Sequence, residues 1–269
     1  MTERAVVLAR GLGTRMRQEA PGAQLDAAQT AAADEGLKAF IPIGRPFLDF
    51  ILSALADAGL TRLCVVIGPE HDVVRRYYTT EVTLSRISVD VAVQAEPRGT
   101  ADAVLAVEAW TQGEPFLVVN GDNYYPVQAL SDLAALTLPG LAAFSQKGLL
   151  ADGQIAPDRI RRFALLDLDG NRLRRIVEKP DHVDAARLQR SPYVSMNCWR
   201  FDTRIFDACR RVPLSPRGEL ELPLAVGHAI DEGRFPVGVV FSDAGVLDLS
   251  GRADIAAVAA RLAGVQVRL

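Results

Sequence analysis

Residues 8–16 read Leu8-Ala9-Arg10-Gly11-Leu12-Gly13-Thr14-Arg15-Met16 and begin at the end of a short apolar run over residues 5–9. An apolar run of this length predicts a buried strand, and the glycines after it predict a tight turn into a helix. Glycines at such a turn also let backbone N–H groups approach a phosphate chain. The stretch is not a P-loop, since no Gly-Lys-Ser/Thr follows, nor a complete dinucleotide fingerprint. A plain strand-to-helix turn is the alternative interpretation.

The pattern around this turn continues as alternating strands and helices. Apolar runs predict strands over 63–67, 87–93 and 116–119, and helical spacing predicts helices over 47–58, 70–78 and 101–110. Near-continuously apolar strands that alternate with helices are typical of a mostly parallel sheet covered on both faces. We therefore expect an α/β fold with right-handed crossovers.

The pattern changes after about residue 140. Residues 159–166 and 172–177 are expected strands that flank Asp167-Leu168-Asp169-Gly170-Asn171, a hairpin signal. Further strands are expected over 193–201 and 236–241, and helices over 203–211, 221–232 and 253–263. No long linker divides the chain, so we expect one domain over 1–269 with a small antiparallel appendage. Residues 21–36 lack clear apolar periodicity and predict a mobile loop that is partly helical.

Composition excludes several classes of function. The chain has 269 residues, a formal charge of −3 and 49% hydrophobic residues, which argues against nucleic-acid binding. We expect no membrane segment and no secretory signal. The 3 cysteines are scattered in apolar stretches, which favours buried free thiols and a cytoplasmic protein.

The stretch 8–16 resembles the opening motif of the sugar-1-phosphate nucleotidylyltransferases, Leu-Ala-x-Gly-x-Gly-Thr-Arg-Met/Leu, and further motifs follow in the family's order. The resemblance implies transfer of a nucleotidyl group from a nucleoside triphosphate to a sugar 1-phosphate, with release of pyrophosphate. It implies a Rossmann-like (GT-A-like) fold, with a nucleotide-binding half over 1–140 and a sugar-phosphate-binding half over 141–269. The residues it assigns to the nucleotide here are Leu8, Ala9, Gly11, Gly13 and Thr14, with Arg15 at the departing pyrophosphate.

A second motif supplies a lysine. Residues 37–43, Leu37-Lys38-Ala39-Phe40-Ile41-Pro42-Ile43, resemble the family's Pro-Lys-x-Leu-x-Pro stretch, with Lys38 as its phosphate-contacting catalytic lysine. The usual proline is Leu37 here, and the insertion at 21–36 lengthens the distance from Arg15. A surface lysine before a strand is the alternative for Lys38 alone.

A third motif concerns the base. Gln94 ends the third expected strand, and Gly99-Thr100 opens the next helix. In the uridylyl- and thymidylyltransferases that this segment resembles, the glutamine reads the pyrimidine and the Gly-Thr pair packs beside it. A glutamine amide can both donate and accept, which matches the O4 and N3–H edge of uracil or thymine. Because residues 99–103 also resemble the corresponding segment of adenylyltransferases, the sequence does not decide which base is bound.

Two aspartates are the candidate metal ligands. Asp122 follows the fourth expected strand in a Gly-Asp-Asn triplet, and Asp248 lies in a segment that resembles the family's Trp-x-Asp-x-Gly, without its tryptophan. Carboxylates together with phosphate oxygens suit Mg²⁺, so Mg²⁺ is the expected cofactor. A turn or helix-cap role is the alternative for either aspartate alone.

The sugar phosphate is the second expected ligand. Ile176-Val177-Glu178-Lys179-Pro180 matches the family's Glu-Lys-Pro motif, in which Lys179 would hold the sugar's phosphate and Glu178 a hydroxyl. Asn197 corresponds to the family's ring-binding asparagine. Arg10 and Arg162 replace small residues of the family, so the sugar pocket could accept a sugar phosphate other than glucose 1-phosphate.

Alternatives from other classes stay open on the sequence. The same fold could act on phosphocholine or a heptose phosphate, use CTP, ATP or GTP, or bind nucleotide sugars without turnover as a regulator. The expected partners are a nucleoside triphosphate and a sugar 1-phosphate, with neither nucleic acid nor membrane. A homodimer is the default expectation for the oligomeric state.

Overall fold

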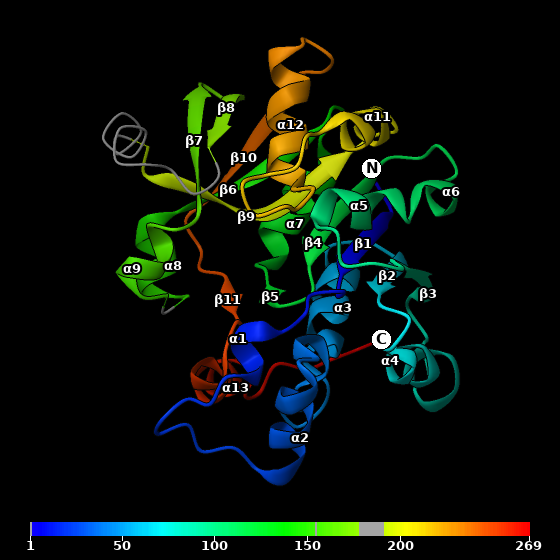
Figure 1. Ribbon diagram of the computed structural model, residues 1–269, viewed down its shortest axis with the longest axis vertical. Coiled ribbons are helices and arrows are strands. Elements are labelled where there is room, and N and C mark those ends of the chain that lie inside the picture. Colours follow the sequence, from blue (N-terminus) through cyan, green and yellow to red (C-terminus); the bar gives the residue numbers. More distant parts are fainter. Residues whose placement is uncertain (1, 154, 178–190) are drawn as a thin grey trace.

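A computed structural model describes residues 2–153, 155–177 and 191–269, shown in Figure 1. Within these residues, nine strands form one sheet in the order β3-β2-β1-β4-β9-β6-β10-β8-β7, and β5 with β11 forms a separate pair. The strand bounds are β1 Arg4–Leu8, β2 Arg62–Ile67, β3 Ser88–Val93, β4 Phe116–Asn120, β5 Asn123–Tyr124, β6 Gly140–Ser145, β7 Ala164–Asp169, β8 Arg172–Val177, β9 Tyr193–Phe201, β10 Gly238–Ser242 and β11 Leu247–Asp248.

The helices lie on both sides of this sheet. Their bounds are α1 Thr14–Arg17, α2 Ala27–Glu35, α3 Phe47–Asp57, α4 Asp72–Arg76, α5 Thr100–Leu105, α6 Glu108–Thr111, α7 Val127–Ala135, α8 Gln146–Ala151, α9 Pro157–Ile160, α11 Arg204–Arg211, α12 Leu222–Asp231 and α13 Ile255–Leu262. Short turns complete the set: the 3₁₀ turns η1 Lys38–Phe40 and η3 Arg252–Asp254, and the π-helical turn η2 Tyr77–Glu81. None of the helices in the described ranges has the length and apolar character needed to cross a bilayer.

The first half of the sheet is parallel, as the sequence predicts. Strand β1 pairs in parallel with β2 and β4, and β2 pairs in parallel with β3. The side chains of Val6 and Val7 point to opposite faces of β1, and both are completely buried. Burial on both faces explains why this strand is a continuous apolar run rather than an alternating one.

Strand β9 joins the two halves of the chain into one sheet. It lies antiparallel between β4 and β6, with Phe116 opposite Phe201 and Leu141 opposite Trp199. Strand β10 pairs in parallel with β6, while β8 and β7 extend the sheet in antiparallel fashion. The antiparallel part expected from the sequence therefore continues the central sheet.

Two apolar cores lie on the two faces of the sheet. One contains the buried faces of α3, α7 and α13, including Phe47 and Leu130. The other contains α5, α11 and α12, where Phe116 stacks on Phe206 with ring centroids 5.6 Å apart. In Figure 1, α11 and α12 lie at the top of the view, and β5 and β11 lie between the main sheet and α1.

One expected strand begins later than predicted, and part of the insertion is helical as expected. Residues 159–163 are not the start of a strand, because Pro157 occupies the first turn of α9 and its fixed φ favours a helix there. Within the insertion, residues 27–35 form α2. Asp26 accepts a hydrogen bond from the N–H of Gln29 at 2.7 Å and caps this helix. The helical part expected within 21–36 is confirmed.

Candidate active site

Two cavities meet at the carboxyl ends of the parallel strands, where ligands gather in open α/β sheets. The smaller has a volume of about 430 Å³ and the larger about 690 Å³, and Arg15, Asn120, Asp122 and Arg217 line both. The expected nucleotide residues that the structure brings together around the smaller cavity are Leu8, Ala9, Gly11, Gly13, Thr14, Arg15, Lys38, Gln94, Gly99 and Thr100. The larger cavity is lined by the expected residues Asn197 and Asp248.

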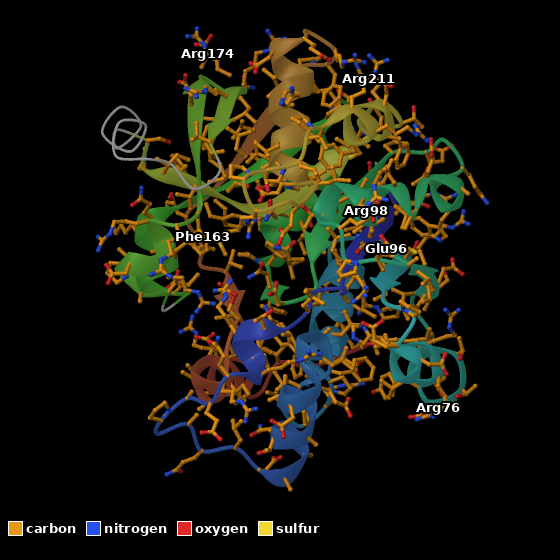
Figure 2. The ribbon with its side chains drawn as sticks, in the orientation of Figure 1. Arg76, Glu96, Arg98, Phe163, Arg174 and Arg211 are labelled. Carbon is orange, nitrogen blue, oxygen red and sulfur yellow. The ribbon has the colours of Figure 1, made fainter. Side chains whose placement is uncertain are left out.

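The two cavities open between elements that are far apart in the sequence. Figure 2 labels Phe163, which lines the larger cavity, beside α9 on one side of this region. On the other side it labels Glu96 and Arg98, on the loop that precedes α5. Glu178 and Lys179, the expected sugar-phosphate contacts, lie outside the described residues.

The two glycines of the loop after β1 have different roles. Gly13 has a φ of +63°, and a Cβ there would lie 2.1 Å from the carbonyl oxygen of Gly36, so only glycine fits. Apart from its neighbours in the chain, a Cβ at Gly11 would meet no atom of the described residues within 4 Å. The protein itself therefore does not require a glycine at position 11, whereas a ligand that approaches the backbone would.

Lys38 lines the smaller cavity and contacts Asp122, which lines both cavities. It begins η1, and its Nζ lies 2.8 Å from Oδ2 of Asp122. Phe40 anchors the same turn through an edge-to-face contact with Tyr77, with ring centroids 5.4 Å apart. The lysine that was expected at the phosphates is thus held against an expected metal ligand.

Asp122 and Asp248 lie side by side. Asp248 pairs with Asn123 in the two-stranded sheet of β5 and β11, and Leu249 N–H donates to the Asp122 carbonyl at 2.8 Å. Burial of Asp248 and the nearby charge of Asp122 raise the pKa of the Asp248 carboxyl to about 6. Ser250 donates its hydroxyl to Oδ1 of Asp248 at 2.8 Å.

This carboxylate pair fits a divalent cation. Asp248 is buried and Asp122 is half-buried, and carboxylate charges in such positions need nearby positive charge. Arg159 and Lys38 supply it in the protein alone, and a cation could supply it in their place. Among the described residues there is no group of three or more His, Cys, Asp or Glu side chains that could hold a metal. The remaining ligands would then be phosphate oxygens and water, as Mg²⁺ prefers.

Arg159 is a site residue that the sequence did not indicate. Its Nη2 lies 2.6 Å from Oδ2 of Asp248, and its Nη1 lies 2.9 Å from Oδ1 of Asp254. It lines the larger cavity from α9, together with Arg162. No motif carries Arg159, since its position depends on α9 folding back onto the segment around Asp248.

Gln94 and its neighbours form the wall of the smaller cavity. Nε2 of Gln94 donates to the carbonyl of Gly99 at 3.0 Å and to Oδ2 of Asp102 at 2.8 Å. Both amide hydrogens are thus used within the protein. In this arrangement Oε1 is the amide atom left for a base, and the contact of Gln94 with the base stays a prediction. Thr100 Oγ1 accepts from Leu222 N–H at 2.8 Å and so ties α5 to α12.

Arg10, the residue that departs from the family pattern, is buried in the same wall. Its guanidinium donates from Nε to the Gln94 carbonyl at 3.3 Å, and Nη1 lies 2.7 Å from Glu70. It lines the smaller cavity and is only 8% exposed. Its two protein contacts show that it is part of the wall.

Asn197 has an unusual backbone within β9. Its φ is +55°, a left-handed conformation that asparagine tolerates better than most residues. Its Oδ1 accepts from Trp199 Nε1 at 3.3 Å. The pairing of β9 with β6 is irregular next to it, between Leu141 and Ala143. Such local strain is concentrated at functional sites.

Comparisons with known proteins agree with this geometry. The chain is 28% identical over 232 residues to a UTP–glucose-1-phosphate uridylyltransferase, AglF, of Haloferax volcanii, a match that covers 86% of this chain and 84% of the relative. It is 29% identical over 230 residues to a glucose-1-phosphate thymidylyltransferase of Streptomyces antibioticus, covering 86% of this chain and 58% of that protein.

Solved structures share the fold. A UDP-glucose pyrophosphorylase solved with UDP-glucose superposes with a TM-score of 0.77 at 16% identity, over 99% of this chain and 100% of that one. The family model described as nucleotidyl transferase matches residues 33–259. This chain therefore belongs to the nucleotidyl transferase family.

Proposed function

We propose that this chain transfers a nucleotidyl group from UTP or dTTP to a sugar 1-phosphate, with Mg²⁺, and releases pyrophosphate. The observation that carries the proposal is that Asp122 lines both cavities, one lined by the glycine loop after β1 and the other by Asn197. The names of the two relatives, a uridylyl- and a thymidylyltransferase, support the same reaction and a pyrimidine triphosphate.

The division of the chain follows from this proposal. Residues 1–140 would hold the nucleotide and 141–269 the sugar phosphate, within a single domain. Leu8, Ala9, Gly11, Gly13 and Thr14 would surround the triphosphate, and Gln94, Gly99 and Thr100 the base. Glu178, Lys179 and Asn197 would hold the sugar phosphate.

Asp122 and Asp248 would hold the divalent cation. When bound, Mg²⁺ neutralises charge on the phosphate oxygens of the triphosphate. The two carboxylates would orient it through the oxygens that Lys38 and Arg159 contact in the protein alone.

The chemical step needs positioning and positive charge rather than a base. A phosphate oxygen of the sugar 1-phosphate is already ionised at neutral pH, so it can attack the α-phosphorus without losing a proton. The bond from that oxygen to phosphorus forms as the bond to the β-phosphate oxygen breaks. Arg15 and Lys38, which line the smaller cavity, would neutralise the departing pyrophosphate.

A pyrophosphate-release assay tests the proposal. The purified chain is offered UTP, dTTP, CTP, ATP and GTP, each with a set of sugar 1-phosphates or with phosphocholine. We expect release with UTP or dTTP and at least one sugar 1-phosphate. Release only with phosphocholine, or release with no acceptor of the set, would overturn it. The variant Asp122→Asn, which should be inactive, gives the background level of pyrophosphate release.

A further inference from the structure

The orientation of the Gln94 amide is fixed by its surroundings. The carboxylate of Asp102 and the carbonyl of Gly99 can only accept hydrogen bonds, at 2.8 and 3.0 Å from Nε2. The NH₂ end must therefore face these two groups. The opposite orientation would place Oε1 against two acceptors, one of them charged.

This orientation leaves one atom for a ligand. No donor bonds to Oε1 of Gln94 among the described residues, whereas both Nε2 hydrogens are used. Gln94 lines the smaller cavity, and only 4% of its surface is exposed. Toward that cavity, Gln94 is an acceptor and not a donor.

Asp102 itself is held in place. It lies in the first turn of α5, and its Oδ1 is 3.6 Å from Nε of Arg98. Gly99, the other acceptor, has a φ of +120°, and a Cβ there would lie 2.4 Å from the Leu220 carbonyl oxygen. The segment at Leu220 thus fixes one acceptor, and α5 fixes the other.

We propose that Asp102 is a positioning residue that selects the base by fixing Gln94 as an acceptor. Ring position 3 of uracil or thymine carries an N–H donor, whereas the same position in cytosine is an acceptor. The N3–H of uracil or thymine donates to Oε1, and cytosine brings two acceptors together. The assignment rests on the proposed function, in that the smaller cavity holds the base.

Equilibrium binding of UTP and CTP, measured by calorimetry without a sugar phosphate, tests this assignment apart from turnover. The wild-type protein should bind UTP more tightly than CTP. Asp102→Leu should narrow the ratio of the two dissociation constants by about tenfold, because one charged acceptor no longer holds the amide. Gln94→Leu removes the contact with the base altogether, so it gives the largest loss of UTP preference that this contact can produce.

Two variants separate selection from a purely structural role. Asp102→Asn keeps an acceptor oxygen and should retain most of the preference. Asp90→Leu removes an exposed carboxylate that accepts from Trp110 Nε1 at 2.8 Å, and should leave the ratio unchanged. A folded Asp102→Leu protein with the wild-type ratio would overturn the assignment, as would equal wild-type binding of UTP and CTP.

The outcome also distinguishes the two proposals. If the wild-type protein releases no pyrophosphate with any acceptor but prefers UTP in an Asp102-dependent manner, the proposed function fails and the base assignment stands. If pyrophosphate is released and the UTP preference does not depend on Asp102, the proposed function stands and the base assignment fails.

Discussion

Arg159 and Asp248 form the ion pair at the centre of the site, with Nη2 of the arginine 2.6 Å from Oδ2 of the aspartate. Lys38 makes the equivalent contact with Asp122 at 2.8 Å. In the protein alone, each carboxylate proposed to hold the cation is thus neutralised by a side chain. A divalent cation must compete with these side chains for the same oxygens.

Removal of Arg159 should make the fold depend more on divalent cations. Arg159→Met removes the guanidinium that pairs with Asp248 and Asp254. Loss of one partner of a largely buried ion pair lowers the free energy of unfolding by about 3 kcal/mol. The same change removes the competitor for Asp248. MgCl₂ should therefore raise the thermal unfolding midpoint of Arg159→Met more than that of the wild type.

The control is Arg174→Met, which breaks an exposed ion pair with Asp169 and should cost less than about 1 kcal/mol. NaCl at equal ionic strength corrects for screening. An identical response of the Arg159 variant and the wild type to MgCl₂ would show that Arg159 does not compete at the carboxylates.

The Asp248 carboxyl should give a measurable pH dependence of stability. Its pKa is raised from 3.8 to about 6 in the folded protein, so the folded state binds this proton more tightly than the unfolded state. The contribution to stability is present at low pH and is lost as pH rises through about 6. By linkage it amounts to about 3 kcal/mol in full, about half of which is lost between pH 5 and pH 7.5.

Urea unfolding at pH 5 and pH 7.5 measures this difference for the wild type and Asp248→Asn. The variant lacks the titrating group, so it should lose less stability than the wild type between the two pH values. Equal losses in both proteins would indicate an ordinary pKa for Asp248.

Asp122→Asn should abolish turnover and leave the fold intact. The amide keeps the shape of the side chain but removes one of the two adjacent charges that would hold the cation. We expect the rate of pyrophosphate release to fall by at least about 10³-fold, which is typical when a charge that stabilises the transition state is lost. Asp132→Asn, a change at a surface aspartate of α7, is the matched control, and near-normal activity of Asp122→Asn would exclude its role.

The sequence predicts the helices and strands themselves better than it predicts which of them lie next to one another. The strand over 193–201 has the bounds that its apolar pattern indicates, yet its place between β4 and β6 depends on pairing across distant segments. Asp122 and Asp248 could be identified from motifs. Arg159 could not, because residues 159–166 read as one strand until Pro157 is seen to start α9. The role of Asp102 depends on which end of the Gln94 amide it contacts, and no sequence pattern encodes that.

The loop after β1 provides a test in which fold and ligand binding separate. At Gly13, alanine is strained by the positive φ and would also collide with the Gly36 backbone. At Gly22 the φ is +87°, but a Cβ would meet nothing within 4 Å. Gly22→Ala should therefore cost about 1 kcal/mol, from the left-handed backbone alone. Gly13→Ala should cost clearly more, and a cost equal to that of Gly22→Ala would show that the backbone at Gly36 yields freely.

Gly11→Ala is the complementary change in the same loop. Because a Cβ at this position meets no atom of the described residues within 4 Å, the variant should keep the unfolding midpoint of the wild type. If the triphosphate approaches the backbone here, the added methyl group takes up that space. The KM for the nucleoside triphosphate should then rise by about tenfold or more, while the KM for the sugar phosphate stays the same. Wild-type kinetics in a normally folded Gly11→Ala protein would place the phosphates elsewhere.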